Sequence, residues 1–336
     1  MAPIKRSAQA ALMLTIGLLS LQSSAADLVQ VPVQVIHGDM QQVIDAKAKL
    51  RVLAEGFQWA EGPVVEPKTG DVLFSDVPAN KVHRYSAKTG LSLYLSPSGY
   101  TGRWPEQNPG QGANGLIFNQ QGELILAQHG DRCLARLQAV LPTPQFECLA
   151  ARFNDKLFNS PNDVVQAKDG SYYFTDPPYG LKQGDQSAQK QQPVNGVYRL
   201  DAQGKVQLLV SELTRPNGLA FSPQGDYLYV ANSDPNAAIW WRYPVLADGQ
   251  LGKGMIWYDA TSLTATETGL PDGLKVKKDG TVIATGPGGI WVWSAQGQLL
   301  GRIKTGVAAA NVALSSDERT LYITASQYLL DIKLKH

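Results

Sequence analysis

Apolar and polar residues alternate in a unit that recurs six times along the chain. Each copy holds a short apolar run, a turn and a second apolar run, and the copies start at residues 61, 114, 162, 217, 272 and 311. Four copies place a glycine eight positions after the first residue, at Gly122, Gly170, Gly225 and Gly280. Short apolar runs joined by a glycine turn are typical of β-hairpins. Each copy therefore predicts two antiparallel strands.

Further strand-like runs lie between the copies, at residues 81–85, 196–200, 239–243 and 289–293. A unit of about 40 to 50 residues with several strands is what a β-propeller blade requires. The sequence predicts an all-β fold, a six-bladed β-propeller with four-stranded antiparallel blades, formed as a single domain by residues 27–336.

The first residues of this domain alternate Val29, Val31, Val33 and Val35, which predicts a strand. Residues 49–53 predict another strand, and we expect it to pair with residues 329–332 at the other end of the chain. Pairing of the two ends closes a propeller ring and removes exposed strand edges.

The first 26 residues have the composition of a secretory signal peptide. Lys5 and Arg6 precede an apolar run at residues 10–21, and Ser24-Ala25-Ala26 forms a small-residue cleavage site. The alternative is a retained membrane anchor. We expect a periplasmic or secreted protein, without stable membrane insertion after cleavage.

The net charge and the two cysteines indicate which partners and which cysteine chemistry to expect. The formal net charge of +1 gives no basic field for nucleic acid, so a nucleic-acid partner is not expected. In an oxidising compartment Cys133 and Cys148 form either a disulfide or two buried thiols. A hairpin turning near residue 141 would bring them almost opposite each other.

Three segments are longer than a tight turn requires, at residues 98–112, 181–194 and 259–270. Long loops on a rigid scaffold often form lids or pocket walls. For the loop at residues 182–192, which is rich in glutamine and lysine, the alternative is a solvated insertion without a role.

The first residue of every copy is polar and carries a side-chain oxygen. Inner strands line the channel of a propeller, so these residues should form a ring: Glu61, Asn114, Asn162, Asn217, Asp272 and Asn311. Buried polar groups need partners, and a cation with oxygen ligands provides one. The set favours calcium over zinc, with magnesium or manganese possible. The alternative is a water-filled channel whose polar residues bind turn backbones.

The second strand of each copy runs back toward the same mouth of the channel. His129 and Asp176 lie near the ends of two such strands, where they could support the ring or carry protons. Each could equally be a turn residue.

Several phrases of the chain resemble those of one known family. They are residues 60–63 (AEGP), 159–165 (NSPNDVV), 174–181 (FTDPPYGL), 215–221 (RPNGLAF) and 271–274 (PDGL). The chain is similar over nearly all of residues 50–330 to the senescence-marker/gluconolactonase-like family of calcium-dependent six-bladed propeller hydrolases.

This resemblance implies a site and a reaction. It places the metal ligands on Glu61, Asn162, Asn217 and Asp272, and substrate contacts on Asn114 and Asn162. It implies hydrolysis of a small-molecule lactone, with the carbonyl polarised by the cation and a water molecule activated by Asp272, or less favourably by His129.

The chain also departs from the family, because Val312-Ala313-Leu314 follows Asn311 where the family continues with a Phe-Gly-Gly-like phrase. This argues against a ligand role for Asn311. Two other functions stay open: a related propeller esterase or phosphoesterase with another substrate, and a non-catalytic propeller plugged by a metal. Protein partners cannot be predicted.

Overall fold

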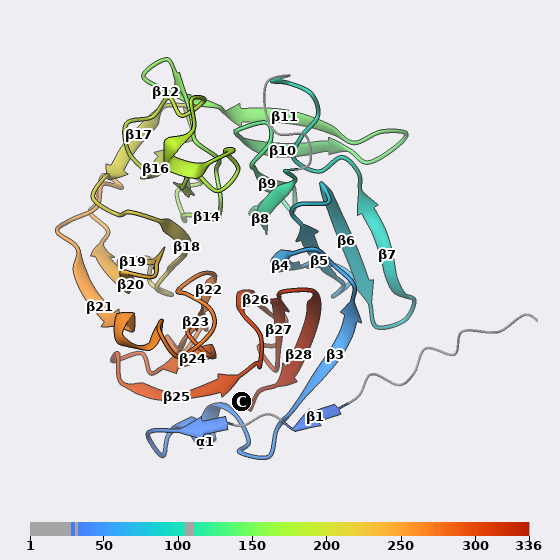
Figure 1. The fold of residues 1–336 in the computed structure, drawn as a ribbon, viewed down its shortest axis with the longest axis vertical. Coiled ribbons are helices and arrows are strands. Elements are labelled where there is room, and N and C mark those ends of the chain that lie inside the picture. The colour runs from blue at the N-terminus through green and yellow to red at the C-terminus, as the bar shows by residue number, and fades with distance from the viewer. Residues whose placement is uncertain (1–27, 31–32, 105–110, 336) are drawn as a thin grey trace, which may run out of the picture.

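The computed structural model describes residues 28–30, 33–104 and 111–335, and nearly all of its regular structure is strand. In this part of the chain six antiparallel sheets surround a central axis, with one strand of each facing the axis (Figure 1). The predicted six-bladed propeller is confirmed. The predicted signal peptide, residues 1–26, lies outside the described residues.

In the first four blades the strands run outward from the axis in chain order. They are β4 (Ala60–Val65), β5 (Val72–Asp76), β6 (Lys81–Ser86) and β7 (Gly90–Leu95); β8 (Ala113–Phe118), β9 (Leu124–Gln128), β10 (Cys133–Ala139) and β11 (Gln145–Ala150); β14 (Val164–Gln166), β15 (Tyr172–Asp176), β16 (Gly196–Leu200) and β17 (Val206–Val210); and β18 (Pro216–Phe221), β19 (Tyr227–Asp234), β20 (Ala237–Pro244) and β21 (Met255–Asp259).

The last two blades receive strands from the N-terminal segment. The fifth contains β22 (Leu274–Val276), β23 (Val282–Gly286), β24 (Gly289–Trp293), β25 (Leu299–Lys304) and β2 (Val33–Val35). The sixth contains β26 (Ala309–Leu314), β27 (Thr320–Ala325), β28 (Tyr328–Lys333), β3 (Lys49–Glu55) and β1 (Leu28–Gln30).

Closure of the ring follows the prediction, because β3 pairs with β28 and Val52 lies opposite Leu330. The prediction of a single strand in the residues before β3 is wrong. Its alternating residues divide between β1, which pairs with β3, and β2, which pairs with β25 in the neighbouring blade. Since one segment crosses between two blades, it cannot remain one strand.

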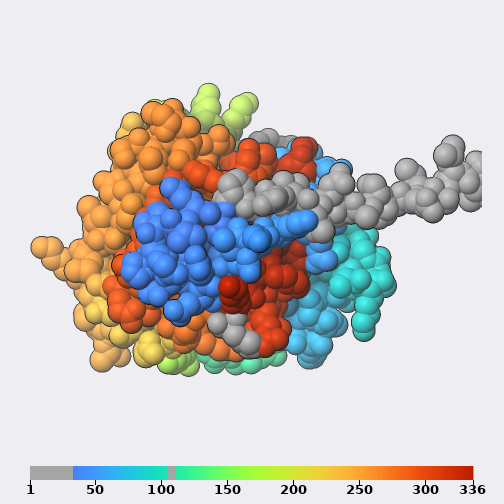
Figure 2. All heavy atoms as spheres, turned by 90° about the horizontal axis from the view of Figure 1, so that it is seen from below, coloured from blue at the N-terminus to red at the C-terminus, as the bar shows by residue number. Residues whose placement is uncertain are grey.

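A short helix, α1 (Met40–Val43), connects β2 to β3 and buries Met40 completely. Figure 2 shows this N-terminal segment packed across the fifth and sixth blades. Its apolar residues join the core cluster between those two sheets, so the segment binds two blades together as well as closing the ring.

The core lies between neighbouring blades, where side chains of adjacent sheets pack together. Trp240 of the fourth blade and Trp293 of the fifth are both buried, with ring centroids 5.0 Å apart in an edge-to-face arrangement. Such aromatic pairs add to the free energy of apolar burial. The rigid wall that results carries the loops at the mouth of the channel.

The structure also contains short elements that the pattern did not predict, namely β12 (Arg152–Phe153), β13 (Lys156–Leu157), η1 (Gly184–Gln186) and η2 (Thr261–Leu263). The loop at 181–194 is anchored to two of them, β12 and β13. Gln192 is 3% exposed, and its amide donates to the carbonyl oxygens of Phe153 and Lys156. This loop is therefore packed against the protein and is not a solvated insertion.

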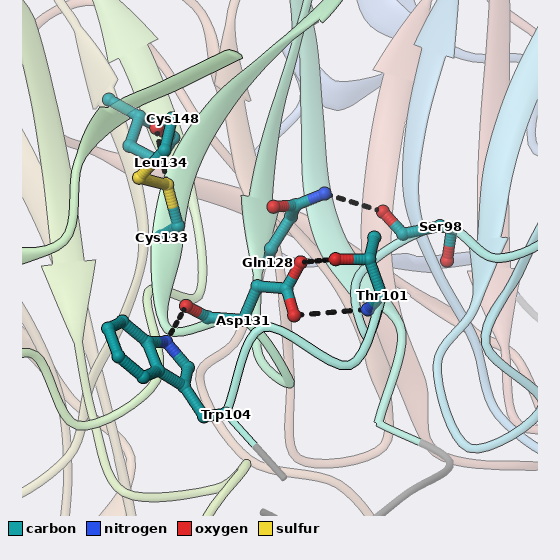
Figure 3. The surroundings of a disulfide bond; sticks show 8 residues. All are labelled: Ser98, Thr101, Trp104, Gln128, Asp131, Cys133, Leu134 and Cys148. Carbon is teal, nitrogen blue, oxygen red and sulfur yellow. Dashed lines mark hydrogen bonds between the residues drawn. A yellow bond between two sulfur atoms is a disulfide. The ribbon is translucent and has the colours of Figure 1, made fainter. Parts of the chain in front are cut away.

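The structure forms the disulfide between Cys133 and Cys148, with the two Cα atoms 6.0 Å apart (Figure 3). The expected hairpin is β10–β11, but its register places Cys148 opposite Ala135. A register shift lies between Leu134 and Ala135, next to Cys133. Of the two alternatives that the sequence left open, the structure contains the disulfide.

Candidate functional site

Five of the six predicted ring residues lie together at one mouth of the channel. They line a cavity of about 490 Å³: Glu61, Asn114, Asn162, Asn217 and Asp272. Three of the inner strands carry a register shift at or next to these residues. A bulge redirects the side chains at a strand end, which is how polar residues at the start of an otherwise apolar strand can face the axis.

Close approach of neighbouring inner strands depends on the glycine that follows the ring residue. A Cβ atom on Gly62 would lie 1.9 Å from the carbonyl oxygen of Asn114, and one on Gly218 would lie 2.3 Å from that of Asp272. Only glycine permits this contact between backbones. The glycines of the Glu61-Gly62 and Asn217-Gly218 pairs therefore allow close packing around the axis.

The expectation that Asn311 belongs to this ring is wrong. Gly115 donates to the carbonyl oxygen of Asn162 at 2.7 Å, and Gly273 donates to that of Ala310 at 2.8 Å. These equivalent contacts give Ala310 the ring position in the sixth blade, and Asn311 follows one residue later. Asn311 does not line the cavity.

Asp176 supports the ring from outside the cavity. Its carboxylate accepts backbone hydrogen bonds from Asn159 at 2.7 Å and from Ser160 at 2.8 Å, and the side chain is fully buried. Burial raises the pKa of Asp176 to about 7. Its contacts fix the segment that leads to Asn162, so its geometry is that of a supporting residue.

His129 lines the cavity and is 2% exposed. Neither ring nitrogen has a hydrogen-bond partner among the described residues. Burial lowers the pKa of His129 to about 4, so the imidazole is neutral at neutral pH. It offers one donor and one acceptor to a molecule in the cavity.

The carboxyl groups of Glu61 and Asp272 lie within hydrogen-bond reach of each other. Burial raises the pKa of Glu61 to about 7. Burial, followed by the nearby charge of Glu61, raises the pKa of Asp272 well above its ordinary value. A bound divalent cation would favour the ionised form of both groups.

The oxygens around them fit such a cation. The side-chain oxygens Oδ1 of Asn114, Asn162 and Asp272 are buried and have no partner among the described residues. Within the same part of the chain no group of three His, Cys, Asp or Glu residues gathers as a metal site. Binding would therefore depend on two carboxylates and several amide oxygens, a donor set that suits calcium.

The walls of the cavity are largely aromatic and aliphatic. They include Trp59, Val77, Pro78, Tyr179 and Leu270. Trp59 and Tyr179 were not among the predicted site residues, although Trp59 lies two residues before Glu61 and Tyr179 belongs to the phrase at 174–181. The Tyr179 hydroxyl donates to the carbonyl oxygen of Ser233 at 3.2 Å, which fixes the ring at the cavity.

The loop at 98–112 is fastened beside the cavity by Asp131 (Figure 3). The carboxylate of Asp131 accepts from the Thr101 amide at 3.0 Å and from its hydroxyl at 2.6 Å, and its carbonyl accepts from Trp104 at 2.8 Å. Gln111, at the far end of this loop, lines the cavity. The expected wall function therefore applies to this loop.

The loop at 259–270 is fastened by Glu267, which pairs with Arg302 and, at 2.9 Å, with Lys304. Arg302 also lies over the ring of Trp291, 4.3 Å from its centroid. Gly269 and Leu270 follow this anchor directly and line the cavity. This loop also forms part of the wall, whereas no residue of the loop at 181–194 lines the cavity.

Fold and site together define a six-bladed propeller with an oxygen-rich ring at the floor of an apolar cavity. The model of the SMP-30/gluconolactonase/LRE-like region matches residues 59–327, and the chain belongs to this family.

Two relatives and one solved structure illustrate the similarity. A gluconolactonase of Zymomonas mobilis is 35% identical over 301 residues, covering 88% of this chain and 84% of the relative. A lactonohydrolase of Aspergillus oryzae is 25% identical over 285 residues, covering 77% and 64%. The structure of a Xanthomonas campestris gluconolactonase superposes with a TM-score of 0.79 at 28% identity, covering 93% of this chain and 98% of that one.

Proposed function

We propose that this protein is a calcium-dependent lactonase that hydrolyses sugar lactones. The observation that carries the proposal is a single cavity in which buried oxygens without partners lie beside two crowded carboxyl groups. The similarity to gluconolactonases supports the reaction class.

The residues that would hold the cation are Glu61, Asn162, Asn217 and Asp272. When bound, a divalent cation supplies Lewis-acid polarisation of a carbonyl oxygen. Asn114 lines the same cavity with a free Oδ1, and its amide is placed to hydrogen-bond the substrate.

Asp272 is the group we assign as general base. Its carboxyl lies within hydrogen-bond reach of Glu61 and Asn217, and its Oδ1 remains without a partner in the described chain. It accepts a proton as the oxygen of water bonds to the lactone carbonyl carbon. The ring C–O bond then breaks, and the proton passes to the departing alkoxide to give the hydroxy acid.

His129 is better suited to bind substrate than to remove a proton. A group whose pKa is about 4 is a weak base at neutral pH. Its neutral imidazole can still hydrogen-bond a hydroxyl or the ring oxygen of a lactone.

The lining of the cavity favours a neutral substrate. Among its described residues there is no lysine or arginine to pair with a phosphate or sulfonate. Trp59 and Tyr179 provide aromatic surface of the kind that packs against the C–H face of a sugar ring. We therefore propose uncharged aldonolactones as the substrate class.

We also propose that the protein acts in the periplasm or outside the cell. The disulfide between Cys133 and Cys148 supports this location, because structural disulfides persist in oxidising compartments. In the described chain no helix is long and apolar enough to cross a membrane. Cell fractionation tests the location, and uncleaved protein in the membrane fraction would contradict it.

The activity is tested by pH-stat hydrolysis of a panel of aldonolactones, aryl esters and phosphoesters, before chelation, after chelation and after calcium is returned. We expect turnover of neutral lactones that chelation abolishes and calcium restores. Metal binding without turnover of any lactone would refute the proposal and favour a non-catalytic propeller.

The role of Asp272 is tested with Asp272→Asn, for which we expect a loss of kcat of at least about 100-fold. The control is Asp331→Asn, since Asp331 is a buried carboxylate that pairs with Arg51 away from the cavity. Full activity in Asp272→Asn would remove Asp272 as the base.

A further inference from the structure

Two blades carry a polar residue, Asp163 or Asn311, directly after the ring position, where the other four blades have glycine. Thr285 donates its hydroxyl to the carbonyl oxygen of Gly273 at 3.2 Å, and Thr324 donates in the same way to Asn311 at 3.3 Å. Asn311 in the sixth blade therefore occupies the position that follows the ring residue. Asp163, which follows Asn162, occupies it in the third blade.

The amide of Asn311 has one possible orientation. Its Oδ1 accepts a hydrogen bond from the backbone N–H of Val312 at 2.8 Å. The Nδ2 group must then point the other way, and it donates to Oε2 of Glu61 at 3.1 Å. The same side chain lies within hydrogen-bond reach of Asp163, and it is 2% exposed.

These contacts determine how the carboxylate of Glu61 is presented. Its Oε2 accepts from the Gly62 amide at 2.5 Å and from Asn311. Two donors therefore hold Oε2, and the Glu61 side chain also lies within hydrogen-bond reach of Asp272. A glutamate has three side-chain torsions, so a neutral donor that restricts them lowers the entropy lost when a cation binds.

We propose that Asn311 is a positioning residue that holds Glu61 in the orientation needed to bind the cation. It acts through Glu61 and is not itself a ligand, because Ala310 occupies the ring position in its blade. This inference rests on the proposed function, since it concerns the same cation site.

The test is the calcium affinity of purified protein, measured by isothermal titration calorimetry and by the calcium-induced rise in Tm. Hydrogen-bond partners of metal ligands contribute about 10- to 100-fold to affinity, and we expect Asn311→Ala to lose that much. Asn311→Gly is the second variant if the first does not fold, because glycine occupies this position in four other blades.

The matched control is Asn119→Ala. The Asn119 amide also donates to a carboxylate, Glu123, at 2.8 Å and accepts a backbone N–H, but it does not line the cavity. We expect this variant to lose stability without a change in calcium affinity. A loss of affinity equal to that of Asn311→Ala would show a general effect of destabilisation and would overturn the inference.

A double-mutant cycle distinguishes positioning from a separate structural role. If Asn311 acts through Glu61, then Asn311→Ala should weaken calcium binding much less in a Glu61→Gln background than in the wild type. Equal losses in both backgrounds, or wild-type affinity in Asn311→Ala and Asn311→Gly, would refute the proposal. Absence of calcium binding by the wild-type protein would instead refute the proposed function.

Discussion

Burial of His129 makes the stability of the protein sensitive to acid. In the folded protein the pKa of His129 is lowered from 6.5 to about 4 by burial, and neither nitrogen has a partner in the described chain. In the unfolded chain the imidazole regains its ordinary pKa. Between those two values the unfolded state binds more protons, so the free energy of unfolding falls as the pH falls.

The size of the effect follows from the two pKa values. One pKa unit corresponds to about 1.4 kcal/mol, so the full interval is worth about 3 kcal/mol. Most of this free energy of unfolding is lost between pH 7 and pH 4.5. We expect the titration of His129 to lower the free energy of unfolding by about 2 kcal/mol over that range. The stabilisation linked to neutral His129 is fully present above pH 6.5, the pKa in the unfolded chain, and it disappears as the pH approaches 4.

The assay is urea unfolding of the wild type and of His129→Gln at both pH values, in chelator so that calcium binding does not contribute. Glutamine does not titrate, so the variant should lose about 2 kcal/mol less on acidification than the wild type. His83 is a control: burial also lowers its pKa, but it is only half-buried, and His83→Gln should change the acid sensitivity less. Identical acid sensitivity of the wild type and His129→Gln would refute the reasoning.

Three other predictions follow from the loops and the cavity. Replacing both Cys133 and Cys148 by serine should lower the free energy of unfolding by about 3 kcal/mol, the loop-closure value for the 15-residue separation, in chemical denaturation; no change would show that the hairpin is held without the disulfide. Glu267→Gln leaves the buried Arg302 without its carboxylate and should raise KM more than it lowers kcat in initial-rate assays. Unchanged kinetics would show that the cavity wall formed by the loop at 259–270 does not depend on the Glu267–Arg302 ion pair. Initial rates should give at least about 10-fold lower kcat/KM for a 6-phosphorylated lactone than for its neutral parent, and a preference for the phosphorylated form would contradict the proposed substrate class.

The architecture could be predicted because each blade repeats the same local chemistry. Strand, turn and strand recur in six copies, four of which have a glycine at the same position in the turn. Closure of the ring needs only an apolar strand at each end of the chain. The strand at 49–53 was identifiable for this reason. The segment before it was not, because a strand that crosses between two blades has the same alternating residues as one that stays in a single sheet.

The composition of the cavity was only partly predictable. Glu61, Asn114, Asn162, Asn217 and Asp272 were found because the repeat itself carries them to the axis. Trp59 and Tyr179 lie on connecting segments, and no periodicity fixes the path of a loop. Their positions depend on single hydrogen bonds, such as the one from Tyr179 to Ser233, that have no pattern in the sequence.

Asn311 shows how a repeat can mislead by one residue. Four copies pair a polar ring residue with glycine, and that glycine marks the register; the sixth copy has none, so its asparagine was matched to the ring. In the sheet, Ala310 faces the axis and Asn311 takes the place of the glycine, where its side chain reaches Glu61. Since side chains on a strand alternate in direction, a shift of one residue changes the chemistry as well as the position. The same substitution that obscured the register supplied the hydrogen-bond donor beneath the ring.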